Sequence, residues 1–197
     1  MNLALFDFDG TVTTTDTFTP FVKVAIPKTR LRWGTLILLP VILGYKAGFI
    51  SSSLIRRLIV RVGFKGFSVS KLNELGQQHN HKFLSKTLRI EAMERISWHK
   101  KQGDRIVVVS ASLDAYLKPW CDELGVELIC SELESKNDIL TGRYLYGDCT
   151  GKNKASRVNN KLNISDYSIV YAYGDTEEDN ELLALADEKY FCWNKID

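Results

Sequence analysis

The sequence predicts an α/β protein with a parallel sheet, and three short strand patterns carry this prediction. Residues 3–6, 105–109 and 168–173 are rich in aliphatic, β-branched or aromatic side chains, without the polar alternation of a half-exposed strand. Such continuous apolar runs are typical of strands that are buried on both faces. Each run is followed by polar residues and then by a helical pattern, so we expect helices on both sides of the sheet.

The remaining elements follow from local patterns. Residues 126–130 read as a fourth strand, and residues 138–146 as a β-hairpin with Thr141-Gly142 at its turn. Amphipathic periodicity predicts helices over residues 113–124, 154–162 and 177–186.

The long interval between the first two strands has helical periodicity and is too long for one crossover helix. We therefore expect an inserted all-helical subdomain over residues 14–87 and an amphipathic helix over 88–102 that returns to the sheet. The sheet domain then comprises residues 1–13 and 88–197.

The composition excludes several classes of protein. The chain has 197 residues, of which 45% are hydrophobic and 25% charged, as in ordinary globular domains. The longest uncharged apolar stretch, residues 33–45, is interrupted by Pro40 and is shorter than the ~20 residues that a spanning helix needs. Four cysteines stand far apart without a CxxC pair, which predicts free thiols in a reducing cytoplasm rather than a disulfide scaffold.

Charge is distributed unevenly along the chain. Between Thr17 and Asn73 there are ten Lys and Arg residues and no Asp or Glu, while 16 basic and 24 acidic residues lie elsewhere. The insertion is therefore a candidate surface for an anionic ligand. Nucleic acid is the less favoured partner, because the segment is rich in leucine and shows no known recognition motif.

The motif Asp7-Phe8-Asp9-Gly10-Thr11 follows the first strand and places two carboxylates two residues apart. In extended backbone, their side chains point to opposite faces, so one could attack a phosphoryl group while the other moves protons. The alternative interpretation is a strand end whose Asp-Gly turn only terminates the structure.

A second acidic motif follows the last main strand. Asp175 and Asp179 stand four residues apart, on one face of a helix that begins near Thr176, and carboxylate oxygens suit a hard cation such as Mg²⁺. The alternative is that these acids only cap the helix N-terminus.

Two further residues could hold a phosphate. Ser110 follows the second strand, where its hydroxyl and the amides of the next turn could contact phosphate oxygens, and Lys154 would supply a positive charge. A helix cap and a solvated lysine are the respective alternatives.

In this order along the chain, the four motifs resemble those of the haloacid dehalogenase superfamily. The resemblance covers residues 1–13 and 88–197, and the insertion looks like the helical cap of the phosphoserine-phosphatase-like subgroup. It implies a Rossmann-like parallel sheet with a cap, and a Mg²⁺-dependent phosphatase that works through an aspartyl-phosphate.

The resemblance also implies a role for each motif residue. Asp7 would be the nucleophile and a Mg²⁺ ligand, and Asp9 the general acid/base, with its backbone carbonyl on the metal. Asp175 would bind Mg²⁺, and Asp179 would support it directly or through water. Ser110 and Lys154 would hold the phosphoryl group, with amides near Gly10 and Ala111 as further donors. Lys154 is preferred to Lys152 because it alone has the Gly-x-x-Lys spacing from Gly151.

The substrate is expected to be a small phosphorylated metabolite. Ser110 is followed by Ala111-Ser112 where phosphoserine phosphatases usually have two glycines, which argues against phosphoserine itself. The alternative is a lipid phosphatase at an anionic membrane surface, because residues 18–59 are similar in character to the caps of bacterial phosphatidylglycerophosphate phosphatases. The latter would place the protein at the inner face of the membrane. A more remote alternative is an inactive phosphate- or membrane-binding module.

Five insertion residues are candidates for the substrate or cap role. Asp16 lies where the chain enters the insertion, and the four basic candidates are Arg30, Arg32, Arg56 and Arg57. The histidines His79, His81 and His99 show no metal-ligand spacing and are interpreted as parts of solvated helix faces.

Overall fold

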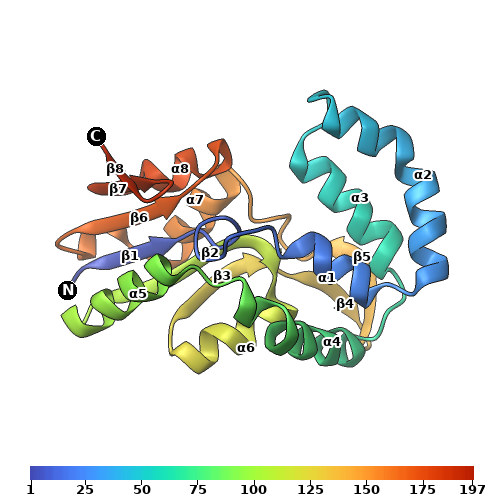
Figure 1. The fold of residues 1–197 in the computed structure, drawn as a ribbon, viewed down its shortest axis with the longest axis horizontal. Helices are drawn as coiled ribbons and strands as arrows, with labels where there is room; N and C mark the ends of the chain where they lie inside the picture. Colours follow the sequence, from blue (N-terminus) through green and yellow to red (C-terminus); the bar gives the residue numbers. More distant parts are fainter.

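The computed structural model describes all residues 1–197 and has the predicted α/β architecture with a mostly parallel central sheet (Figure 1). Six strands form the main sheet in the order β3-β2-β1-β6-β7-β8, and only the β7–β8 pair is antiparallel. Their bounds are β1 Leu3–Phe6, β2 Arg105–Leu113, β3 Glu127–Ser131, β6 Val170–Gly174, β7 Glu188–Phe191 and β8 Asn194–Ile196.

Helices cover both faces of the sheet, as the strand patterns predict. On one face lie α5 (Ile90–Gln102) and α6 (Asp114–Leu124), and on the other lie α7 (Lys152–Lys161) and α8 (Asn180–Leu183) (Figure 1). Alternate strand residues supply the two cores: Phe6 packs in the first with α5 and α6, and Leu5 packs in the second with α7 and α8. This division explains why the strands are apolar throughout.

The insertion is helical throughout. It contains α1 (Phe18–Ala25), α2 (Lys28–Lys46), α3 (Ser52–Phe64) and α4 (Val69–Lys82), followed by a short 3₁₀ turn at Leu84–Lys86. Its two ends lie together, because the amide of Thr14 donates to the carbonyl of Thr87 at 2.8 Å.

The helices of the insertion differ in how they contact the sheet domain. Helix α4 lies along α6 so closely that a Cβ on Gly76 would overlap the carbonyl of Ala115, whereas α2 and α3 stand away from the sheet (Figure 1). We use the term cap for α1, α2 and α3.

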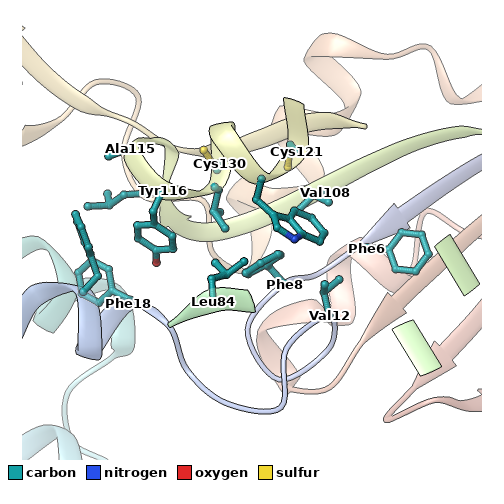
Figure 2. Packing of buried hydrophobic residues seen from close by; sticks show 14 of the residues in the cluster. Phe6, Phe8, Val12, Phe18, Leu84, Val108, Ala115, Tyr116, Cys121 and Cys130 are labelled. Atoms are coloured by element: carbon teal, nitrogen blue, oxygen red, sulfur yellow. The ribbon is translucent and has the colours of Figure 1, made fainter. Parts of the chain in front are cut away.

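One apolar core joins the sheet to the cap. Phe8, Leu84 and Tyr116 pack together in it, and Phe18 at the start of α1 extends the same cluster (Figure 2). Every one of these side chains is buried. The shared core fixes the position of α1 relative to the polar strand ends.

Two local expectations were wrong, and two strands were not expected. The hairpin consists of β4 (Leu133–Lys136) and β5 (Ile139–Tyr144), and it turns at Asn137-Asp138 rather than at Thr141-Gly142. Both turn residues have positive φ, which Asn and Asp tolerate. The predicted helix over 177–186 is a 3₁₀ turn, Glu177–Asp179, followed by the single turn α8, and the edge strands β7 and β8 were not anticipated.

The histidines are a further correction, because His79 and His99 are buried rather than solvated. His99 hydrogen-bonds Asp104 and Tyr173 through its two ring nitrogens, and His79 packs among aromatic rings. The sequence did not show this burial, because a single histidine on an amphipathic helix does not reveal whether its ring faces the core or the solvent.

No helix of the structure combines the length and apolar character required to cross a membrane.

Candidate active site

The polar strand ends meet at one edge of the sheet and bring three carboxylates together. Asp7 follows β1, Asp175 follows β6, and Asp179 lies in the 3₁₀ turn after it. One oxygen from each of the three lies within 4.8 Å of the others. Because β1 and β6 are parallel neighbours, their carboxyl ends necessarily point to the same edge.

Lys154 completes this group from the first turn of α7. Its buried ammonium donates to Oδ1 of Asp7 and, at 2.5 Å, to Oδ1 of Asp179. Burial alone would lower the pKa of Lys154, but the two carboxylates outweigh that effect and raise it, so the side chain stays charged. Lys152, the other lysine of this segment, is exposed.

Burial raises the pKa of Asp7 well above its ordinary value, and the charge of Lys154 opposes this rise. Burial likewise raises the pKa of Asp175, whose Oδ1 accepts a hydrogen bond from the Thr11 hydroxyl at 2.9 Å. The nearby Asp179 carboxylate also raises the pKa of both groups, and a cation placed among such like charges would relieve their repulsion.

Asp179 differs from the other two carboxylates because its own chain occupies both of its oxygens. Oδ1 accepts from Lys154, and Oδ2 accepts from the amides of Asp175 and Thr176 and from the Thr176 hydroxyl, each at 3.1 Å. Asp179 therefore fixes the loop that carries Asp175. The carboxylate oxygens of Asp7 and Asp175 accept fewer hydrogen bonds from the protein, so they are more available to bind a metal.

Gly10 is required at the turn after Asp9. Its φ is +91°, and a Cβ at this position would overlap the Asp175 carboxylate. Only glycine lets the first and last motifs approach this closely. The Gly10 amide faces the Thr13 hydroxyl at 3.4 Å, and its carbonyl accepts from Arg89 at 3.0 Å.

The side chain of Asp9 lies outside the three-carboxylate group. Its Oδ1 accepts from the amide of Thr17 at 2.6 Å and from the hydroxyl of the same residue, and its Oδ2 accepts from the Ser112 hydroxyl. Burial raises the pKa of Asp9, while the Ser112 and Thr17 hydrogen bonds oppose the rise. A carboxyl with a raised pKa is suited to proton transfer. The metal role expected for its backbone carbonyl stays a prediction.

Ser110 and Ala111 lie in the last part of β2, where the pairing with β3 shifts register. The Ser110 oxygen accepts from the Ser112 amide at 3.0 Å, and its own O–H makes no hydrogen bond to the protein. Ser110 and Ala111 are both buried at the edge that holds Asp7. Their phosphate contacts remain predictions.

The five candidate residues of the insertion differ in their position and contacts. Arg56 is the one that faces the site: its guanidinium lies over the Phe18 ring, and the charges of Asp9 and Glu178 outweigh burial and raise its pKa. One terminal nitrogen of Arg56, Nη1, is enclosed without a hydrogen-bond partner. The side chains of Arg32 and Arg57 are exposed.

Two other candidates have structural contacts instead. Asp16 accepts from the amides of Phe18 and Thr19, both at 3.1 Å, and so caps α1. Arg30 donates to the carbonyls of Val62 at 2.9 Å and Lys65 at 2.5 Å, at the C-terminal end of α3. The cap contacts the site loop directly where the Ser52 hydroxyl donates to Glu178.

Sequence reasoning did not identify Thr11, Thr17 and Ser112 as site residues. Each hydroxyl contacts an aspartate of the site. Thr11 and Ser112 stand inside the recognised motifs, which is the only signal that could have found them, whereas Thr17 lies outside any motif.

The comparisons with known proteins agree with this arrangement. A family model described as haloacid dehalogenase-like hydrolase matches residues 4–184. The chain belongs to this family. As a member, it is a hydrolase, and its fold is that of the phosphoserine-phosphatase-like members with a helical cap.

Two bacterial proteins resemble the chain in sequence. Protein CicA of Caulobacter vibrioides is 31% identical over 196 residues, spanning 95% of this chain and 84% of that protein. A histidinol-phosphatase of Neisseria meningitidis is 29% identical over 108 residues, about half of each chain.

Solved structures share the fold at lower identity. A Bordetella pertussis protein superimposes with a TM-score of 0.81 at 20% identity, covering 96% of this chain and 89% of that one. A probable phosphoserine phosphatase of Vibrio cholerae has a TM-score of 0.72 at 18% identity, covering 96% and 55%.

Proposed function

We propose that this hydrolase is a Mg²⁺-dependent phosphomonoesterase that acts through an aspartyl-phosphate on Asp7, with a small phosphorylated metabolite as substrate. The observation that carries the proposal is the position of the Lys154 ammonium between Asp7 and Asp179, with Asp175 beside them. A buried cation next to a buried carboxylate favours the ionised form of that carboxylate and leaves a positive group where a phosphate would bind.

The donor set suits Mg²⁺. The free oxygens of Asp7 and Asp175 are hard ligands at the same sheet edge, and Mg²⁺ is usually bound by one or two carboxylates together with water and substrate oxygens. When bound, the metal would neutralise charge on the phosphoryl group. Asp179 would hold the Asp175 loop in place.

The chain's own residues would carry out the two chemical steps. The Asp7 carboxylate attacks phosphorus, the bond from phosphorus to the ester oxygen breaks, and protonated Asp9 gives its proton to the leaving alkoxide. Water then attacks the phosphorus of the aspartyl-phosphate, Asp9 takes the proton from that water, and the bond to the Asp7 oxygen breaks. Inorganic phosphate and ionised Asp7 result.

The decisive experiment measures phosphate release with and without Mg²⁺. The panel holds p-nitrophenyl phosphate, phosphoserine, sugar and nucleotide phosphates, and phosphatidylglycerophosphate in mixed micelles. We expect release that is lost in chelator and in Asp7→Asn but kept in Asp122→Asn, a matched change at an exposed aspartate of α6. The preferred panel member decides between a soluble and a lipid substrate.

A quench experiment tests the intermediate. With ³²P-labelled substrate, the label should appear on the chain during turnover, be absent from Asp7→Asn, and persist longer in Asp9→Asn because its breakdown needs the base. Turnover without label on any variant would overturn the aspartyl-phosphate route, and retained activity in Asp7→Asn would overturn the proposal.

A further inference from the structure

We propose that the outer face of α2 docks the protein on an anionic lipid bilayer surface. We call this face the α2 face and define it by Trp33, Leu36, Ile37, Pro40 and Leu43. The spacing of these positions places all five on one side of the helix, and every one of them is exposed. The largest of them, Trp33, is 68% exposed.

The opposite side of α2 already has its partner. Gly34 and Leu38 are the buried residues of the helix, and a Cβ on Gly34 would approach Val62 of α3 to 3.0 Å. Arg30, one turn before Gly34, is held by carbonyls at the end of α3. The α2 face therefore points away from α3, the helix that α2 packs against, and α2 lies at the outer edge of the cap (Figure 1).

Apolar exposure continues beyond the helix end. Phe49, in the turn between α2 and α3, is 88% exposed. Large apolar side chains gathered on one exposed helix face are uncommon on a protein that has no partner, and they mark an interaction site. At about 1.5 Å per residue, the 19 residues of α2 extend nearly 30 Å, which suits a helix lying in the plane of a bilayer surface.

The basic residues beside the α2 face indicate that the surface it binds is anionic. Lys28, Arg32 and Lys46 lie along one margin of the α2 face, as their spacing from Leu36 and Leu43 shows, and each is exposed and without an ion pair. Lipid headgroups attract such cations, while their aliphatic stems can lie along the apolar boundary. The cations and apolar residues would thus contact different layers of the same surface.

A second copy of the chain is the less favourable occupant. The segment from Thr17 to Asn73 has no acidic residue. A symmetric contact through α2 would bring two sets of cations together with no carboxylate from either cap between them. Such like-charge contacts oppose association.

Vesicle co-sedimentation tests the proposal with the full chain and with Asp7→Asn. Docking does not depend on the chemistry of Asp7, so both proteins should bind vesicles of phosphatidylglycerol and phosphatidylcholine, and bind pure phosphatidylcholine weakly. This arm also separates failure of docking from failure of the proposed phosphatase activity.

Charge and apolar variants then locate the contact. Each cation near an anionic surface strengthens binding roughly fivefold, so neutralising Lys28, Arg32 and Lys46 together to Gln should weaken it about 100-fold. The matched control neutralises three exposed lysines elsewhere: Lys82, Lys86 and Lys101. It has the same net charge and should retain most of the binding.

The apolar contact is tested by a variant of the α2 face and a control variant elsewhere. Trp33→Gln with Ile37→Gln should weaken binding roughly tenfold or more, because two large side chains no longer enter the lipid boundary. Ile90→Gln, at a 78% exposed position of α5, should leave it unchanged. Brominated lipids should quench tryptophan fluorescence in the wild type and in Trp98→Phe, but much less in Trp33→Phe.

Results of two kinds, from vesicle binding and from light scattering, would overturn the docking proposal. One is absence of binding to anionic vesicles, or binding that the α2 variants and their controls weaken equally. The other is a stable dimer in light scattering that Trp33→Gln converts to monomer, which would assign the α2 face to a second copy of the chain.

Discussion

Replacing Lys154 by Met should destabilise the folded protein strongly while keeping the volume of the side chain. Lys154 is 3% exposed and forms ion pairs with two carboxylates whose side chains are 7% and 1% exposed. Two charge-assisted hydrogen bonds of about 1.5–3 kcal/mol each are lost, roughly 3–6 kcal/mol in total. Removing one partner of a buried pair costs about 3–5 kcal/mol, which agrees with this sum.

The loss should depend on pH with a definite sign. Burial already raises the pKa of Asp7 above its value in the unfolded chain, and without Lys154 nothing opposes that rise. An acid with a raised folded-state pKa stabilises the fold only when it is protonated, so the loss should be larger near about pH 8 than near about pH 5.5. Millimolar Mg²⁺ should restore part of it, since a bound cation replaces the missing charge.

Urea unfolding, followed by circular dichroism at both pH values with Mg²⁺ or chelator, measures this effect. Lys152→Met, at the exposed lysine of the same helix, is the matched control and should change the free energy of unfolding by less than about 0.5 kcal/mol. A loss below about 1 kcal/mol for Lys154→Met, or one that does not change with pH, would refute the reasoning.

Three further predictions follow from individual contacts. Gly10→Ala should reduce the rise in melting temperature on adding Mg²⁺, because its Cβ displaces the Asp175 carboxylate, which we propose as a metal ligand; Gly48→Ala, also at positive φ but with open space, should retain that rise. Ser112→Ala removes a hydrogen bond that lowers the pKa of Asp9, so the alkaline limb of kcat/KM should move to higher pH, and a downward shift would contradict this. Burial lowers the pKa of His79, so wild-type stability relative to His79→Phe should fall as pH drops through about 6.5, by up to ~1.4 kcal/mol per pH unit, as paired unfolding curves would reveal.

Much of the fold could be predicted because its signals are local. The buried strands at the centre of the sheet have continuous apolar sequences, and the motifs after them contain the three clustered carboxylates, Asp7, Asp175 and Asp179, and the lysine that contacts two of them. Parallel strands place their carboxyl ends at one edge, so predicting the strands was enough to bring Asp7 and Asp175 together. The edge strands β7 and β8 escaped prediction because they are short and only partly buried or exposed.

Contacts between distant segments could not be predicted in the same way. Ser112 reaches Asp9 across 103 positions of sequence, and the Thr17 contact depends on where the core places α1. The basic residues of the insertion have similar local sequence, yet Arg30 holds the end of α3, Arg56 faces Asp9, and Arg32 remains exposed.

The sequence by itself determined the α/β class, the helical insertion, the four motifs and the uneven charge, because each of these features depends on residues that lie close together along the chain. The tertiary structure alone decided which hydroxyls hold Asp9, which arginine faces the site, and which side of α2 is left uncovered. These depend on how helices pack against one another, and packing is settled by long-range burial rather than by local pattern.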